Sequence, residues 1–153
     1  MSQDGVDLET SLGYLLKEAS SALRIAMEAV LRPLGMTVTH YSCLELLAQR
    51  PGLSNSELAR GAFVTRQSMN VLLHALERDG YVTRPAEARV GKVLPTQLTS
   101  RGRRSLETAT VAVRSVEVRM LGGMTQEEQS GAYKMLQSII HSLRNEDEGG
   151  SQQ

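Results

Sequence analysis

The chain has 153 residues, 41% of them hydrophobic, and its 17 Lys and Arg balance its 17 Asp and Glu. This length supports one domain with a hydrophobic core, or a small domain with helical extensions, and it excludes two independent enzymatic domains. The single cysteine, Cys43, excludes an intrachain disulfide and a cysteine metal cluster, and the three histidines are too dispersed to indicate a metal site.

The first predicted element is a long amphipathic helix. Apolar residues recur at three- and four-residue steps from Leu8 to Val30, and Pro33 and Gly35 end the pattern. The apolar face of such a helix exceeds what a small domain covers. We therefore expect the surplus to pack on another helix, in this chain or in a second copy.

Two shorter helices follow. Thr37 is a candidate N-cap for a helix with an apolar face, and residues 50–52 (Arg-Pro-Gly) end that helix. Ser54 and Glu57 have the spacing of a capping box, which predicts a short helix through about Gly61. The apolar face of the first of these helices consists of Tyr41, Leu44, Leu47 and Ala48.

Thr65 is the candidate cap of the next helix, and Gly80 stands where a helix ends in a left-handed residue. Met69, Leu72, Leu73 and Leu76 form its apolar stripe, so Arg66, Gln67, Ser68, Asn70 and His74 are expected to point away from the core. Two short helices joined by a tight turn, the second presenting small polar and basic residues near its start, predict a helix-turn-helix. Gln and Asn can pair with adenine, Arg with guanine, and a helix N-terminus favours phosphate.

A two-stranded hairpin is predicted next, from residues 81–83 and 93–98. Its basic tip, residues 84–92, would place Arg89 and Lys92 beside a nucleic-acid groove or backbone, and Pro95 makes the second strand an edge at that point.

A long helix opens at residues 99–104, with Leu106, Val113, Val116 and Met120 expected inside, and ends at Gly122. Thr125 and Glu128 form another capping box before a last helix with an apolar stripe, and residues 145–153 are expected to fray.

Charge is segregated along this chain. Residues 60–104 contain nine Lys and Arg against three Asp and Glu, a net charge of +6, whereas the other residues contain eight against fourteen, a net charge of −6. A neutral protein with one basic face can bind a polyanion, because phosphates respond to the local field. The basic segment coincides with the predicted helix-turn-helix and hairpin. The basic run Arg101, Arg103 and Arg104 is either part of this contact or a solvated helix start.

Other functional classes have less support in the sequence. No run of about 18 apolar residues occurs, and residues 1–7 lack the features of a signal peptide, so a soluble cytoplasmic protein is expected. Aromatic residues are sparse, which disfavours a protein that stacks single-stranded bases on aromatic side chains. No G-x-S-x-G, G-x-G-x-x-G or H-E-x-x-H motif occurs, so we expect neither an enzyme nor a cofactor.

The order and spacing of four motifs resemble those of the MarR family of bacterial winged-helix regulators, over nearly the whole chain. The motifs are residues 53–59 (LSNSELA), 64–70 (VTRQSMN), 76–82 (LERDGYV) and 98–102 (LTSRG). The resemblance implies a mainly α fold with a small two- to three-stranded β wing, and a homodimer with two recognition helices in successive major grooves of a pseudo-palindromic site. It also implies a transcriptional regulator, in most cases a repressor, that a small aromatic ligand can release from DNA.

This resemblance assigns residues 1–36 to an N-terminal dimerisation helix, 37–99 to the winged helix-turn-helix domain, 100–145 to C-terminal dimerisation helices and 146–153 to a flexible tail. The chain departs from the family at two places. The turn between the motif helices usually carries Leu-Gly but here has Ala62-Phe63, so Gly61 is the expected source of backbone freedom. The wing usually carries Asp-x-Arg, whereas residues 90–92 are Val-Gly-Lys, and Lys lacks the planar fork of Arg.

Two sets of site residues follow from these patterns. The residues predicted to contact DNA are Ser54, Thr65, Arg66, Gln67, Ser68, Asn70, His74, Arg84, Arg89 and Lys92. The residues predicted to contact a small ligand in the crevice that the family carries are Tyr14, Arg24, His40 and Tyr41, for which a core or interface role is the alternative. Two other functions stay open: a redox-responsive regulator acting through Cys43, and a dimeric interaction module without sequence-specific DNA binding.

Overall fold

The computed structural model describes residues 5–84 and 95–149, which form two compact units, Met1–Val116 and Glu117–Gln153. In the first unit, α1 spans Leu12–Leu31 and is followed by a 3-10 turn, η1 (Arg32–Leu34), and by α2 (Val38–Gln49). Helix α1 begins four residues later than the apolar pattern predicts, because the Ser11 hydroxyl accepts the Tyr14 amide and caps the helix there. Leu8 therefore lies before the helix.

The predicted caps are confirmed. Thr37 caps α2 by accepting the His40 amide, and Ser54 and Glu57 form the capping box of α3 (Asn55–Gly61). Thr65 caps α4 (Arg66–Arg78) by accepting the Ser68 amide. Each cap satisfies a backbone amide that the first turn of a helix leaves without a carbonyl. Local sequence therefore determines where all three helices begin.

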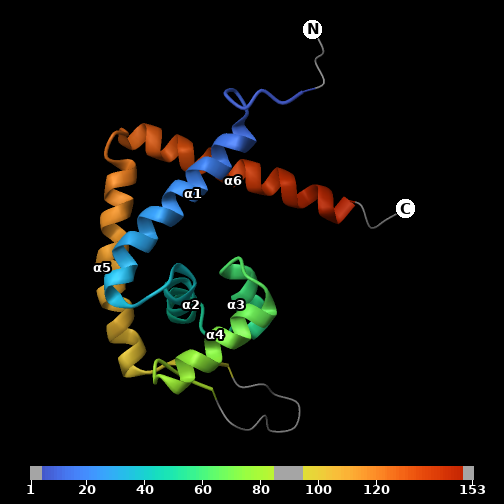
Figure 1. Cartoon of the computed structure of the whole chain (residues 1–153). Helices are drawn as coiled ribbons and strands as arrows, with labels where there is room; N and C mark the ends of the chain where they lie inside the picture. The colour runs from blue at the N-terminus through green and yellow to red at the C-terminus, as the bar shows by residue number, and fades with distance from the viewer. Residues whose placement is uncertain (1–4, 85–94, 150–153) are drawn as a thin grey trace. The chain divides into compact units, whose positions relative to one another are not determined.

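Helices α2, α3 and α4 gather around one hydrophobic core (Figure 1). Of the predicted stripe of α4, Met69, Leu73 and Leu76 are buried and Leu72 is partly buried. They pack in the same cluster as Leu44 and Leu47 of α2, whereas Ala48, predicted on the same face, is exposed. Full burial of a leucine side chain stabilises the fold by about 1.5–3 kcal/mol. This core holds α4 with its polar side outward.

The β hairpin is confirmed in its described part. Strand β1 (Val82–Thr83) pairs antiparallel with β2 (Gln97–Leu98), Val82 opposite Leu98. Pro95 lies before β2, so the described part of the second strand is shorter than predicted. The predicted basic tip from residue 85 to residue 92 lies outside the described residues.

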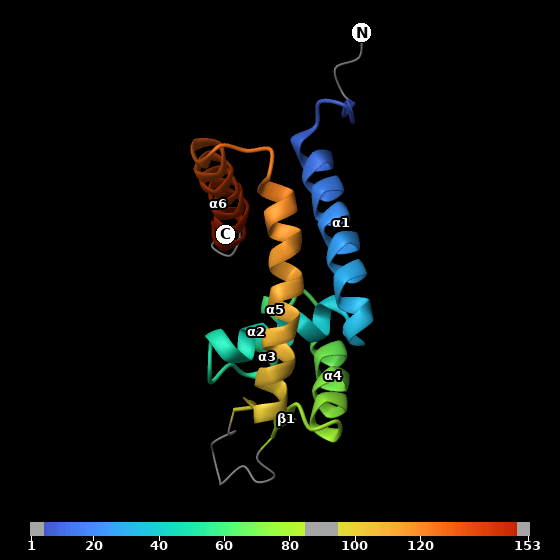
Figure 2. The same cartoon turned by 90° about the vertical axis from the view of Figure 1, so that its left-hand side faces the viewer.

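Strand β1 lies at the end of α4 and the start of α5 (Ser100–Leu121) (Figure 2). The Thr99 amide donates to the Tyr81 carbonyl (3.1 Å), and the Thr99 hydroxyl donates to the Gly80 carbonyl (2.6 Å) and accepts the Gly102 amide (3.0 Å). Thr99 thus caps α5 and joins it to the end of α4. Leu106 and Ala109 of α5 complete the core.

Along α5, Leu106 and Val116 are buried and Val113 is partly buried, as predicted. Met120, which was expected inside, is 51% exposed. The spacing of apolar residues does not show at which residue a helix stops contacting other elements. The capping box of Thr125 and Glu128 is present.

Helix α6 (Gln126–Gly149) continues past the point where fraying was expected. Residues 145–149 are helical, and they contain no proline and no glycine before Gly149. The Asn145 amide nitrogen lies 2.9 Å from His141 Nε2, one turn earlier, which is a contact typical of a regular helix. Only residues 150–153 of the predicted tail lie outside the described residues.

Large apolar side chains remain exposed on the terminal helices of each unit. In α1 the set is Leu12, Tyr14, Leu15 and Ile25, and in α6 it is Tyr133, Met135, Leu136, Ile140 and Leu143. The expected surplus of apolar surface is therefore present. No described helix combines the length and apolar character that a membrane crossing requires.

Candidate nucleic-acid interface

The start of α4 presents a row of exposed polar side chains. Arg66, Gln67 and Ser68 are all exposed in the first turn, directly after the capping residue Thr65. The Thr65 hydroxyl accepts the Ser68 amide and donates to Ser68 Oγ, both at 3.0 Å. The cap holds Ser68 in place, and it leaves the amides of the first turn facing outward as donors for an anion.

Asn70 differs from the other predicted contact residues. Its Oδ1 accepts a hydrogen bond of 2.7 Å from Asn55 Nδ2, and the pair is partly buried between α3 and α4. The expectation that Asn70 points away from the core is thus only partly met. Its side chain joins the two helices of the motif.

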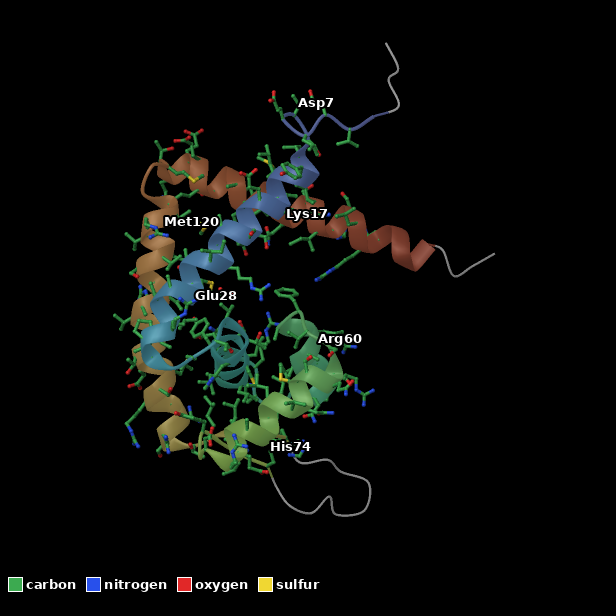
Figure 3. All side chains as sticks on the ribbon, in the orientation of Figure 1. Asp7, Lys17, Glu28, Arg60, His74 and Met120 are labelled. Carbon is green, nitrogen blue, oxygen red and sulfur yellow. The ribbon has the colours of Figure 1, made fainter. Side chains whose placement is uncertain are left out.

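Basic groups surround this row. Arg60 on α3 and His74 on α4 are exposed (Figure 3). The Arg66 guanidinium has no ion pair among the described residues, whereas Arg78 pairs with Asp79 at 3.3 Å. Exposed guanidinium groups without a carboxylate partner are available to phosphate or to guanine.

Arg84 marks the described end of the first wing strand. Its amide donates to Glu77 Oε2 at 3.1 Å, which fixes the exit of the wing against the end of α4. Arg84 is partly exposed to solvent. Arg89 and Lys92, the other two predicted wing contacts, lie outside the described residues.

Ser54, also predicted to contact DNA, is exposed at the start of α3, where its hydroxyl accepts the Glu57 amide at 3.2 Å. Glu57 in return accepts the Ser54 amide, and these hydrogen bonds lower the pKa of the Glu57 carboxyl. The hydroxyl is therefore primarily a structural cap. Its remaining hydrogen-bonding capacity faces solvent.

His40 lies at the junction of α2 with the wing. Its ring packs edge-on against Tyr81, with 5.4 Å between ring centroids, and the Arg101 guanidinium lies 4.7 Å from the centroid of the same tyrosine ring. His40 Nε2 is buried and has no hydrogen-bond partner in the described part of the chain. Burial lowers the pKa of His40, and the nearby Asp79 carboxylate partly opposes that shift.

A pocket of about 860 Å³ opens in the first unit beside the turn between α3 and α4. Its lining includes Arg24, one of the predicted ligand contacts, but not Tyr14, His40 or Tyr41, all of which the structure describes. The residues that line the pocket are Ser20, Leu23, Arg24, Met27, Glu28, Arg32, Gly35, Met36, Thr37, Val38, Thr39, Ser42, Ala62, Phe63 and Val64.

The pocket lining combines apolar and polar side chains. Leu23, Met27 and Met36 contribute apolar surface, and two arginines, Arg24 and Arg32, supply positive charge. Arg24 Nε pairs with Glu28 Oε1 at 3.1 Å, whereas the Arg32 side chain has neither a hydrogen bond nor an ion pair among the described residues. The lining therefore carries one unpaired positive charge next to apolar surface, which suits a small organic anion.

The turn between α3 and α4 contains an unexpected residue in the left-handed conformation. Phe63 has φ +61° and is 88% exposed. Gly61 is the last residue of α3, and a Cβ atom added there would lie 3.0 Å from the Leu46 side chain. The prediction that Gly61 supplies the backbone freedom was wrong. The left-handed conformation costs a non-glycine residue roughly 1–2 kcal/mol. The Ala-Phe pair at the place of the usual Leu-Gly was the only sequence signal.

Cys43 is fully buried in α2. Burial raises the pKa of its thiol to about 12, because the thiolate would lose its hydration. A reactive cysteine requires an accessible thiolate, so this environment favours an inert core residue.

Together, a capped helix pair, a polar second helix and an antiparallel hairpin define the first unit as a winged helix-turn-helix protein. A model of the MarR family matches residues 34–93. The chain is 42% identical over 135 residues to the HTH-type transcriptional repressor Rv2887 of Mycobacterium tuberculosis, with 88% of this chain and 97% of that protein covered. The chain therefore belongs to the MarR family.

Two solved structures of the same M. tuberculosis MarR family protein are similar to this chain. In complex with salicylic acid, it superimposes with a TM-score of 0.72 at 41% identity, covering 90% of this chain and 99% of that one. In complex with DNA, the TM-score is 0.70 at 42% identity, covering 85% and 98%.

Proposed function

We propose that this protein is a transcriptional regulator that binds double-stranded DNA as a homodimer and acts as a repressor. The observation that carries the proposal is the exposed row Arg66, Gln67 and Ser68 at the capped start of α4. In a helix-turn-helix protein, the first residues of the second helix contact base edges in the major groove. The similar M. tuberculosis repressor, solved with DNA, supports the same use of this fold.

The roles of the predicted contacts divide by chemistry. Arg66 is assigned to guanine and Gln67 to adenine, since their side chains can form paired hydrogen bonds to those bases. Ser68, Asn70 and His74 also lie on α4 and are assigned to neighbouring bases or phosphates. Ser54, Thr65, Arg84, Arg89 and Lys92 are assigned to the phosphate backbone, where they position the protein without reading sequence.

The homodimer is proposed from the apolar surface of the terminal helices. In α6 the exposed apolar residues Tyr133, Leu136, Ile140 and Leu143 recur at three- and four-residue steps, and α1 exposes further large apolar side chains. A contiguous exposed apolar face is unfavourable in a monomer. A second copy would cover them and would place two recognition helices about one DNA turn apart. Size-exclusion chromatography with light scattering should give twice the mass of the 16.7 kDa chain, and a monomer at micromolar concentration would contradict the proposal.

A small aromatic acid is the proposed effector. The pocket beside the α3–α4 turn combines apolar surface with Arg32, which has no ion pair in the part of the chain that the structure describes. The M. tuberculosis relative was solved with salicylic acid. A cytoplasmic location and the absence of catalysis are part of the same proposal, because a DNA-bound regulator requires neither export nor a reaction. Footprinting on the DNA that flanks the protein's own gene, repeated with salicylate and related acids, tests both parts. Protection that salicylate removes is the expected result.

A further inference from the structure

Three helix ends in the first unit have the same hydrogen-bonded motif. After η1, the Met36 amide donates to the Leu31 carbonyl (3.2 Å) and the Gly35 amide to the Arg32 carbonyl (2.9 Å). After α4, Tyr81 donates to Leu76 (2.9 Å) and Gly80 to Glu77 (3.1 Å). Both ends place a glycine at the left-handed position, with φ +70° and +84°. This is the Schellman motif, in which glycine is the favoured residue.

The end of α3 has the same pattern with a different residue. The Val64 amide donates to the Ala59 carbonyl (3.0 Å), the Phe63 amide donates to the Arg60 carbonyl (3.3 Å), and Phe63 occupies the left-handed position. The backbone there is unfavourable for phenylalanine, and the exposed ring gains almost nothing from burial in the fold. Folding alone therefore gives no reason for a phenylalanine where the other two ends have glycine.

The position of Phe63 supplies a reason. It lines the pocket together with Arg32, and it lies two residues before Thr65, the residue that caps α4. An aromatic ring is well suited to pack against another aromatic ring, and such pairs favour stacked or edge-on contacts. A ligand that packs on Phe63 would hold the turn from which the exposed row of α4 begins.

We propose that Phe63 is the specificity-determining residue of the pocket: its ring packs on the ring of an aromatic carboxylate whose carboxylate group binds Arg32, and this contact transmits binding to the start of α4. The inference rests on the proposed function, since it assigns a role within the proposed effector pocket. It requires two features in one ligand, a planar ring and an anionic group. A carboxylate on a saturated ring of the same size carries the same negative charge but lacks the aromatic face.

The test compares salicylate with cyclohexanecarboxylate by calorimetry on the full chain, without DNA. Glycine adopts the left-handed backbone of residue 63 without strain, so Phe63→Gly should fold. A change in its affinity for the acids then reports the loss of the phenylalanine ring. Wild type should bind salicylate at least tenfold more tightly than cyclohexanecarboxylate, and Phe63→Gly should lose that preference. Phe63→Tyr should keep it. Leu34→Ala, which removes an exposed apolar side chain from η1 outside the pocket lining, should bind both acids as wild type does.

Duplex binding measured on the same variants separates the two proposals. Phe63→Gly should bind the selected duplex within about twofold of wild type, but salicylate should no longer release it. Salicylate binding to Phe63→Gly that equals wild type would overturn the role of Phe63, and so would an equal preference of the wild type for the two acids. Failure of the wild type to bind any duplex would instead overturn the proposed function, whatever the calorimetry shows.

Discussion

Asn55 Nδ2 donates a hydrogen bond of 2.7 Å to Asn70 Oδ1, and this contact joins the two helices of the helix-turn-helix. A hydrogen bond between partly buried side chains contributes about 0.5–1.5 kcal/mol. Asn70 lies one turn after Arg66, so its anchoring also fixes the rotation of α4 about its axis. The pair therefore connects the stability of the motif with the direction in which its exposed row points.

A double-mutant cycle tests that connection. Asn55→Ala and Asn70→Ala should each destabilise the fold, and their combination should destabilise it by less than the sum, with an interaction energy of about 0.5–1.5 kcal/mol. Urea unfolding of the four proteins measures it. Additive effects would mean that the hydrogen bond contributes nothing to the packing of α3 on α4. DNA affinity should fall in Asn55→Ala as well, although Asn55 is not itself a predicted contact.

Gly102 should be intolerant of substitution. A Cβ atom at this position would lie 2.2 Å from the Tyr81 carbonyl oxygen, a backbone atom that β1 and Thr99 hold in place. Gly102→Ala should therefore destabilise the chain by about 1–3 kcal/mol. Gly131→Ala on α6 is the matched control, because nothing lies within 4 Å of its added Cβ, and alanine there should be neutral or stabilising. Equal melting temperatures for the two variants would contradict the close approach of α5 to β1.

The partly buried His40 predicts a loss of stability in acid. Its pKa in the folded chain lies below the ordinary value of 6.5, so the unfolded chain binds the extra proton first. The contribution of the neutral His40 side chain to the free energy of unfolding is fully present above pH 6.5. It is lost as the pH falls through the pKa of His40 in the folded chain. The charged groups nearby are Asp79, which opposes the shift, and Arg101 on Tyr81.

Comparison with His40→Phe isolates this effect, because phenylalanine keeps the ring against Tyr81 and does not titrate. Thermal unfolding between pH 5 and pH 8 should show a steeper loss of stability for the wild type than for the variant. Parallel curves would mean that His40 is not the group responsible.

Cys43 should not respond to peroxide. Its thiol is buried and its pKa is raised to about 12, so almost no thiolate exists near neutral pH. Treatment with hydrogen peroxide should leave DNA binding of the wild type and of Cys43→Ala unchanged, as measured by fluorescence anisotropy. Release that occurs in the wild type and disappears in Cys43→Ala would support the redox alternative.

The parts of this fold that depend on neighbouring residues in sequence were predictable. Caps such as Thr37, Ser54 and Thr65 act within one turn, so the sequence contains all of their partners. The left-handed Phe63 was not predictable in the same way, because its conformation follows from the hydrogen bonds of a motif that normally selects glycine. The sequence showed an absence of glycine at the turn but not how the backbone accommodates it.

Contacts between distant elements were the least predictable. His40 was assigned to the ligand crevice from its place on α2, whereas in the structure its ring packs against Tyr81 and is not part of the pocket lining. Asn70 was assigned to solvent because the apolar stripe of α4 lies elsewhere, and its partner Asn55 is fifteen residues away. Both contacts join residues that are distant in sequence, and periodicity within one helix does not report such contacts.

The central claim is that Arg66 and Gln67 read base sequence, and selection from a random pool of duplexes tests it most directly. Wild-type protein at low salt should enrich a pseudo-palindromic site with half-sites about one helical turn apart. Arg66→Ala and Gln67→Ala should lose about 1–3 kcal/mol of discrimination per contacted base pair, whereas Arg89→Ala and Lys92→Ala should weaken binding evenly and reduce its salt dependence. Enrichment of no sequence by the wild-type protein would contradict the account.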